Sequence, residues 1–140
     1  MYAQEVKHIK TRSYEGYLFP GNMRIGVFPR IDGCDLSDEQ IQKAEEILAA
    51  HFIEIKGLCH HNEVINKCSL KTYKRQYWGS IDERGHIIVN MQLIKKSLAK
   101  QIQLENEKEI VSICDGGCDV IDVTVDLDDG TYRIVPNGYA

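Results

Sequence analysis

The residues best suited to binding a metal gather in one short segment: Cys59, His60, His61 and Cys68. Zinc prefers tetrahedral sulfur and nitrogen ligands, and its cysteines usually sit on short Cys-x₂₋₄-Cys knuckles. Cys59 and Cys68 are too far apart in sequence for such a knuckle, and adjacent histidines point to opposite sides of an extended chain. The sequence therefore predicts no metal and no cofactor. Cys59, His60 and His61 stay as the candidate ligands if a metal is bound.

A disulfide is the other use for these thiols. The chain has five cysteines: Cys34, Cys59, Cys68, Cys114 and Cys118. An odd number leaves at least one thiol outside any internal bridge. A Cys59–Cys68 bridge would close a loop of about ten residues and stabilise the fold by roughly 2–3 kcal/mol in the chain-entropy model, and a Cys114–Cys118 bridge would close a loop of about five. We predict the Cys59–Cys68 pairing for an exported protein, whereas in a reducing cytosol all five could be thiols.

No group of residues specifies a reaction. A cysteine nucleophile needs a histidine beside it and a third group that orients the histidine. Cys59 with His86, or Cys118 with His61, would supply the first two, but no flanking signature supports either pair. The sequence also shows no nucleophile elbow around a serine and no glycine-rich phosphate loop before a helix. We predict no catalytic residue.

An acidic run near the C-terminus comprises Asp122, Asp126, Asp128 and Asp129. Carboxylates of this kind bind calcium in EF-hands, but the EF-hand spacing is absent. We interpret these residues as a solvated strand face followed by a turn.

The aromatic and basic residues of one predicted strand are the best candidates for binding: Tyr73, Arg75, Tyr77 and Trp78. These residue types are enriched among the hot spots of protein interfaces. They could equally pack within a sheet, and the sequence leaves both interpretations open. A net charge of −4 and a pI near 5.7 argue against nucleic acid as the partner.

The strongest pattern lies in residues 71–94, which we expect to form a long β-hairpin. Aromatic and β-branched residues recur there on both sides of a polar turn. Because side chains alternate along a strand, Tyr73, Arg75 and Tyr77 share one face. Alternate residues of the return strand 87–93 are all apolar, which predicts a sheet covered on one side and mixed on the other.

The clearest helix start follows a loop at residue 35. Ser37 suits the N-cap, and Gln40 is placed to complete a capping box. Apolar residues then recur at three- to four-residue spacing and form one stripe: Ile41, Ala44, Leu48, Phe52 and Ile55. We expect the helix to end near Gly57, giving a length of about 28 Å.

The other elements are shorter. Residues 1–13 predict an edge segment or a frayed arm, and residues 25–31 a short strand. Residues 95–108 are compatible with a short helix or a long loop. The last third predicts a strand at 109–113 and a hairpin built from 121–127 and 131–135, because apolar and polar residues alternate there.

Together these elements predict a single α+β domain spanning residues 1–140. One long helix packs on a curved antiparallel sheet of at least four strands, an outline that is cystatin-like or NTF2-like. The composition is 43% hydrophobic and 27% charged, which is typical of a globular domain. No apolar run approaches the 18 or so residues that suggest a membrane-spanning helix.

Two stretches resemble a known sequence pattern. Tyr73–Gly85 reads YKRQYWGSIDERG and is similar to a recurrent YKRQYxGxIDxxG motif. Cys114–Ala140 is similar to the matching C-terminal pattern, a DGG turn followed by an alternating strand pair and a closing NG-A. Both occur in small uncharacterised proteins, often exported, of Bacteroidetes-type bacteria. The resemblance covers about a third of the chain, and it implies a shared sheet and export but no activity.

Localisation is left open between the periplasm or exterior and the cytoplasm. Residues 1–4 contain neither a charged segment nor an apolar one, although a small residue before Gln4-Glu5 fits the remnant of a cleavage site. The function we expect is a non-catalytic binding or inhibitory module acting on a protein partner. The alternative is a small enzyme or ligand-binding protein with a pocket between helix and sheet. The oligomeric state cannot be read from the sequence.

Overall fold

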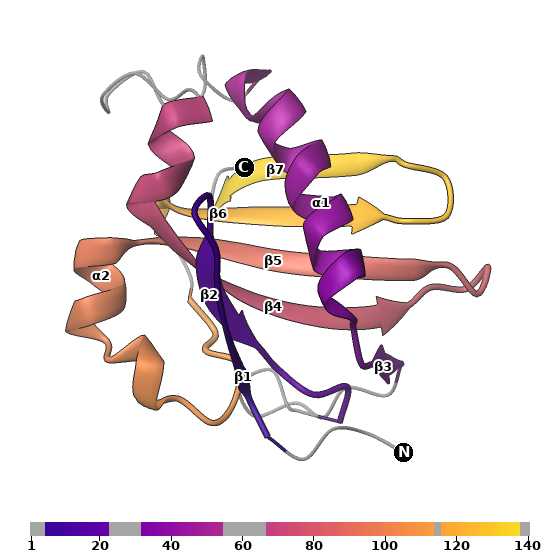
Figure 1. Cartoon of the computed structure of the whole chain (residues 1–140), viewed down its shortest axis with the longest axis horizontal. Coiled ribbons are helices and arrows are strands. Elements are labelled where there is room, and N and C mark those ends of the chain that lie inside the picture. The colour runs from indigo at the N-terminus through magenta and orange to yellow at the C-terminus, as the bar shows by residue number, and fades with distance from the viewer. Residues whose placement is uncertain (1–4, 23–31, 55–66, 114–115, 138–140) are drawn as a thin grey trace.

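The computed structural model describes residues 5–22, 32–54, 67–113 and 116–137. Its strands are β1 (Lys7–Lys10), β2 (Glu15–Leu18), β3 (Gly33–Cys34), β4 (Tyr73–Ile81), β5 (Ile87–Lys95), β6 (Gly117–Asp126) and β7 (Tyr132–Asn137). Its helices are α1 (Asp38–His51), α2 (Lys96–Gln101) and the 3₁₀ helices η2 (Lys67–Thr72) and η3 (Leu104–Asn106). The seven strands form one sheet, and α1 lies across one face of it (Figure 1). The α+β class and the presence of at least four strands are confirmed.

Helix α1 begins where the sequence predicts. The Ser37 hydroxyl accepts a hydrogen bond from the Gln40 backbone N–H at 3.2 Å, and the Gln40 side chain accepts one from the Ser37 N–H at 2.8 Å. The capping box is therefore confirmed. The α-helix has 14 residues, and a 3₁₀ turn continues it through residue 54. The end that we expected near Gly57 lies outside the described residues.

The sheet is mixed, so the prediction of an antiparallel sheet is wrong in one place. The strand order is β1-β2-β4-β5-β6-β7, with β3 also paired to β4. Strands β4 to β7 are antiparallel in succession, as expected. Strand β2 runs parallel to β4, with Gly16 opposite Arg75 and Leu18 opposite Tyr77. A parallel pair needs a long crossover connection, and here that connection contains β3, α1 and η2.

The sheet face under α1 is the main core. Tyr77 of β4 lies opposite Met91 of β5, which lies opposite Val123 of β6. These three side chains are buried in one cluster with Ile41 and Leu48 of α1. The predicted apolar stripe of the helix therefore packs on the predicted apolar face of the hairpin.

The opposite face is also covered at one end, so the expectation of a sheet covered on one side is wrong. Strand residues Ile94 and Val120 pack with Leu104 of η3 and with Ile110 in a second apolar cluster. The chain from α2 to residue 113 supplies this cover, and Figure 1 shows α2 beside the sheet on the side away from α1. The thin apolar stripe of residues 95–108 gave little indication of this role.

A row of polar side chains crosses this second face. The Gln76 amide donates to Gln92 at 2.7 Å, and the Gln92 amide donates to Asp122 at 2.8 Å. Asn137 also donates to Asp122, at 2.8 Å. Gln76 exchanges two hydrogen bonds with the backbone of Val111, at 2.7 and 3.0 Å. The predicted strand at 109–113 is wrong, because a side chain takes the backbone groups that a neighbouring strand would have paired.

The remaining predictions have mixed outcomes. Residues 7–10 form β1 at one edge of the sheet, as an edge segment was expected to do. The strand expected at 25–31 lies outside the described residues. Neither described α-helix combines the length and the hydropathy needed to cross a bilayer.

Candidate functional site

A cleft of about 530 Å³ opens beside α1. One side is the α1 face carrying Gln42, Glu45 and Ala49, whose spacing places them along one stripe. The rest of the described lining comes from the β1–β2 turn, Thr11–Tyr14, and from Leu70 and Lys71 of η2. The volume lies within the range of small-molecule pockets.

A buried ion pair forms the floor of this cleft. Arg75 donates to both carboxylate oxygens of Glu45, at 2.9 and 3.1 Å, although the two residues are 30 positions apart. The Tyr77 hydroxyl donates to the same carboxylate at 2.6 Å. Only 1% of Arg75 and 5% of Glu45 is exposed. Burial, followed by the charge of Glu45, raises the pKa of Tyr77 far above its usual range, so this hydroxyl stays a donor.

Two further hydrogens of the Arg75 guanidinium bind backbone oxygens. One terminal nitrogen donates to the carbonyls of Leu70 and Tyr73, each at 2.8 Å. The side chain therefore ties η2 to the sheet as well as to α1. Bidentate geometry and full hydrogen bonding are the conditions under which a buried ion pair is tolerated.

Gly16 brings the β1–β2 turn close to this floor. A Cβ atom on Gly16 would lie 2.4 Å from the Arg75 carbonyl oxygen and 2.8 Å from the Tyr77 ring. Strand β2 can therefore approach β4 at this point only with a glycine there. The parallel pairing of β2 with β4 then places residues 11–14 opposite α1.

The turn itself is held by Thr11. Its hydroxyl donates to the Tyr14 carbonyl at 3.1 Å and accepts from the N–H groups of Ser13 and Tyr14, at 3.2 and 3.1 Å. These short-range bonds make the turn a compact unit. Arg12 occupies its exposed tip.

The charges around the turn are unevenly distributed. Among the described residues, none offers an ion pair or side-chain hydrogen bond to Arg12, Lys71 or Lys96. A smaller hollow of about 150 Å³, also lined by the turn, includes these three side chains and Lys10. A chain whose net charge is −4 thus gathers four cations around one turn.

Tyr14 adds a hydrogen-bond donor at the cleft. Its hydroxyl makes no hydrogen bond with a described side chain, and the residue is half-buried. Burial, and then the charge of Glu45, raises the pKa of Tyr14 above its usual range. The hydroxyl is therefore protonated at neutral pH and can donate to a ligand.

The arrangement is better suited to binding than to proton transfer. A general base must have an oxygen or nitrogen free to take a proton from the substrate. Both oxygens of Glu45 already accept hydrogen bonds, from Arg75 and Tyr77. The described part of the cleft contains no histidine or cysteine, and its other carboxylate, Glu46, is exposed to solvent and accepts a hydrogen bond from Gln42.

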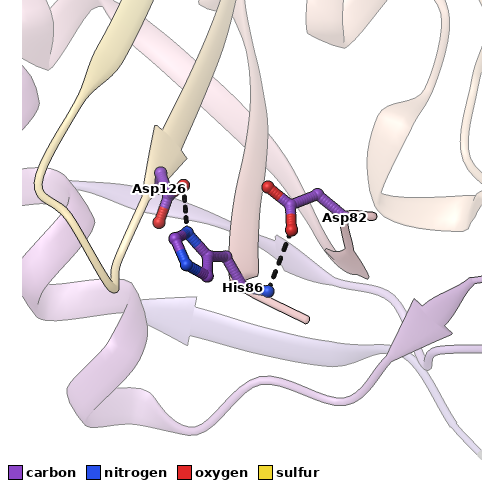
Figure 2. Close-up of side chains that lie close together, drawn as sticks. All are labelled: Asp82, His86 and Asp126. Carbon is purple, nitrogen blue, oxygen red and sulfur yellow. Dashed lines mark hydrogen bonds and ion pairs between the residues drawn. The ribbon is translucent and has the colours of Figure 1, made fainter. Parts of the chain in front are cut away.

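A second group of polar residues joins the tips of two hairpins. Figure 2 shows Asp82 and His86 at the β4–β5 turn and Asp126 at the end of β6. His86 Nδ1 lies 2.9 Å from Asp126 Oδ2, and the His86 backbone N–H donates to Asp82 at 2.9 Å. The hydrogen bond with Asp126 raises the pKa of His86 above its usual value.

Arg84 completes this hairpin-tip group. One of its nitrogens donates to Asp82 at 3.0 Å and to Asp126 at 2.9 Å, and another approaches Asp129 at 3.4 Å. Burial alone would raise the pKa of Asp126, but hydrogen bonds from His86 and the backbone outweigh it and lower the pKa. The group therefore fixes the two hairpin tips to each other.

Among the described residues, those that could hold a metal ion belong to this same group. Asp82, His86 and Asp126 each offer one ligand atom, and these atoms lie within 4.8 Å of one another. The guanidinium of Arg84 already supplies positive charge to the two carboxylates. The geometry thus accounts for this acidic group without a metal.

Of the two interpretations left open for the predicted binding residues, packing within the sheet is the one that holds for three of them. Tyr73, Arg75 and Tyr77 are buried under α1, with at most 1% of each exposed, because their strand face belongs to the core. Trp78 is half-buried on the opposite face, beside the second apolar cluster. The Tyr73 hydroxyl donates to the Cys118 carbonyl at 2.7 Å, and burial raises its pKa to about 12.

Most of the predicted metal and disulfide residues lie outside the described part of the chain. Cys59, His60 and His61 lie outside the described residues. The side chain of Cys68 is also not described, so the Cys59–Cys68 pairing stays a prediction. Among the cysteine side chains that the structure describes, Cys118 is disulfide-bonded and Cys34 is not.

Sequence reasoning missed the cleft, although two signals were present. Glu45 falls on the inward side of the predicted stripe, between Ile41 and Leu48, where a charge needs a buried partner. Arg75 falls on the same strand face as Tyr73 and Tyr77. Pairing the one charge in the helix stripe with the one cation on the apolar strand face would have predicted this ion pair. Nothing local indicated that Arg12 and Tyr14 would lie beside them.

The acidic run forms a strand end and turn, as interpreted, but its strand face is not solvated, because Asp126 is buried and Asp122 is half-buried and hydrogen-bonded to Gln92. Asp128 Oδ2 accepts the Ile87 N–H at 2.8 Å, and Asp126 Oδ1 accepts the N–H groups of Asp128 and Asp129 at 2.9 and 3.2 Å. The sequence did not reveal that Arg84 and His86 would meet these residues from the other hairpin.

Comparison with models of protein families, with curated proteins and with solved structures finds no match to this chain.

Proposed function

We propose that the protein binds a small ligand in the cleft between α1 and the β1–β2 turn, without catalysing a reaction on it. The observation that carries this proposal is the buried Glu45–Arg75 pair at the base of a cleft of about 530 Å³. The pair fixes α1, η2 and β4 relative to one another, so the cleft is preformed. Preformed sites bind with less loss of conformational entropy.

A fragment titration followed by ¹⁵N NMR tests the proposal. Ligands bound in the cleft should shift the backbone resonances of residues 11–14 together with those of Gln42 and Ala49. Ala49→Phe should reduce binding, because Ala49 is a small residue lining the cleft. Ala50→Phe is the matched control, since Ala50 is exposed and does not line the cleft. Shifts confined to other parts of the chain would contradict the proposal.

Recognition of a protein partner is the second candidate. It is supported by the hairpin tips, which Arg84 and His86 hold together and which carry the exposed apolar residue Ile81. Figure 1 shows both hairpins projecting at the same end of the sheet. Rigid, adjacent loops can bind a protein surface with little loss of entropy. An inhibitory role would use the same loops.

Co-purification from the native host tests this second candidate. A partner that recognises the tips should be lost with the double variant Ile81→Ser/Glu83→Lys. It should be retained with Glu107→Lys, which makes a similar charge change in the exposed segment after η3. Equal recovery with both variants would exclude the tips as the binding surface.

The finer outline of the fold and the family also stay proposals. A single helix packed over an antiparallel run of strands supports a cystatin-like or NTF2-like outline with a curved sheet. The motifs in Tyr73–Gly85 and Cys114–Ala140 support kinship with the exported Bacteroidetes-type proteins. A solved structure of a protein with both motifs would test the two together.

A further inference from the structure

We propose that the ligand of this cleft is a small organic anion, with its carboxylate or similar group at Arg12 and Lys71 and its apolar body against Leu70 and Ala49. The inference rests on the ligand-binding function proposed above and adds the chemical class of the ligand.

Charge is the first argument. Arg12 and Lys71 both line the cleft, and no described carboxylate pairs with either of them. The buried Glu45 carboxylate is already neutralised by Arg75. Glu46 is the remaining acidic residue among those described in the cleft, and its carboxylate accepts a hydrogen bond from Gln42 at 3.2 Å. The balance of unpaired charge at the cleft therefore favours an anion.

Directional donors are the second argument. The Tyr14 hydroxyl is protonated at neutral pH and makes no hydrogen bond with a described side chain. Ser13 also lines the cleft, and its hydroxyl makes no hydrogen bond with a described residue. A carboxylate accepts up to four hydrogen bonds, so it can use these donors and the two cations together.

Cations that line the neighbouring hollow add to the positive electrostatic field at the cleft. Lys10 and Lys96 line the hollow that shares Arg12 and Lys71 with the cleft, so their charges add to the same long-range attraction. Glu15 is the acidic residue among the described lining of that hollow, and it pairs with His8 at 2.8 Å. Cations gathered around one turn raise the local concentration of anions and their association rate, an effect that salt screens.

Apolar surface is the third argument, and it excludes a bare inorganic ion as the best ligand. Leu70 is buried, Ala49 of α1 and Tyr14 are half-buried, and all three line the cleft. A cleft of about 530 Å³ is far larger than phosphate or sulfate. An anion with a hydrocarbon or aromatic body fills it and gains hydrophobic contact.

Matched acid and amide probes test the inference. The pairs are benzoate and benzamide, hexanoate and hexanamide, and 4-phenylbutyrate and 4-phenylbutyramide, each titrated by ¹⁵N NMR at low salt. Each pair shares its apolar body and differs in charge. We expect the acids to bind about tenfold more tightly than the amides, with the largest shifts in residues 11–14. The preference should shrink as salt is added.

Charge-removing variants test whether Arg12 and Lys71 are the groups that recognise the anion. Arg12→Gln/Lys71→Gln should bring acid affinity down to that of the amide while leaving amide affinity unchanged. Lys100→Gln is the matched control, because Lys100 is an exposed cation of α2 that lines neither hollow. All three side chains are exposed, so the variants are expected to fold, and circular dichroism confirms it. Tyr14→Phe should weaken the acids by a few-fold.

The outcomes separate the two proposals. If neither acids nor amides bind in the cleft, the ligand-binding function itself is overturned. If acids and amides bind there equally, the cleft binds ligands but the anionic class is overturned. If the acids bind more tightly but the double variant leaves that preference intact, Arg12 and Lys71 are not the recognising groups and the inference is overturned.

Discussion

At the scale of single residues, the cleft depends most on the contact between Glu45 and Arg75. Each is a charged side chain in an apolar interior, and each is tolerated because the other is there. Removing one partner of such a pair leaves an uncompensated buried charge, which costs more than the pair itself contributes.

We therefore expect Glu45→Gln to lower the free energy of unfolding by about 3–5 kcal/mol in urea titrations. Replacing both partners, as in Glu45→Leu/Arg75→Met, should cost less than this single change, because no buried charge remains. A loss below about 1 kcal/mol for Glu45→Gln would mean that water reaches Arg75 in solution and that the pair is not a buried floor.

His86 gives a prediction for pH. Its pKa is raised in the folded protein by the hydrogen bond with Asp126, so folding favours the imidazolium. Its contribution to stability is therefore complete below the unfolded pKa of about 6.5 and is lost as the pH rises through the folded pKa. The pKa of Asp126 is lowered in the folded protein, so folding favours the carboxylate. The contribution of Asp126 to stability is therefore lost only as the pH falls through its folded pKa.

An NMR titration of the imidazole resonances checks the cause. Asp126→Asn keeps the shape of the side chain and removes its charge, so the pKa of His86 should fall. Asp119→Asn, at the far end of β6, should leave the His86 pKa unchanged. An unchanged pKa in Asp126→Asn would show that the two hairpin tips are not joined in solution.

Strand β2 is the element whose position decides whether the cleft exists. It pairs in parallel with β4 and carries the β1–β2 turn to the side of α1. The pairing requires close approach of the two backbones at Gly16, whose added Cβ would meet Arg75 and Tyr77. Overpacking at such a contact forces the strand to move.

Gly16→Ala should lower the free energy of unfolding by about 1–3 kcal/mol and weaken ligand binding at the same time. Ser13→Ala is the control for stability, because Ser13 is exposed in the turn. The diagnostic measurement is the hydrogen exchange of β2 amides, which should become faster in Gly16→Ala. Unaltered exchange of the β2 amides would mean that the substitution does not disturb the contact between β2 and β4.

For the whole molecule, binding in the cleft should stabilise the fold, since the ligand contacts groups from α1, η2 and the β1–β2 turn. At ten times its Kd, 4-phenylbutyrate should add about 1.4 kcal/mol to the free energy of unfolding. For a chain of this size the Tm should rise by roughly 3–5 °C. 4-Phenylbutyramide at the same concentration should raise it less, and Arg12→Gln/Lys71→Gln should remove the difference.

The sequence by itself determined the local elements. The capping box at Ser37 and Gln40 marked the start of α1, and the alternating residues of β4 and β5 gave the two faces of the hairpin. These signals are local, because capping and periodicity depend on residues a few positions apart. They predicted the α+β class and a helix lying on the hairpin.

Tertiary structure alone decided where the candidate site lies. Glu45 and Arg75 are 30 residues apart, and Arg84 and Asp126 are 42 apart. No periodicity connects such positions, because their meeting depends on strand order and on the crossover between β2 and β4. The same crossover turned an expected antiparallel sheet into a mixed one and covered the Tyr73 and Tyr77 face with α1. Local patterns thus specify elements and faces, while long-range pairing decides which charges face each other.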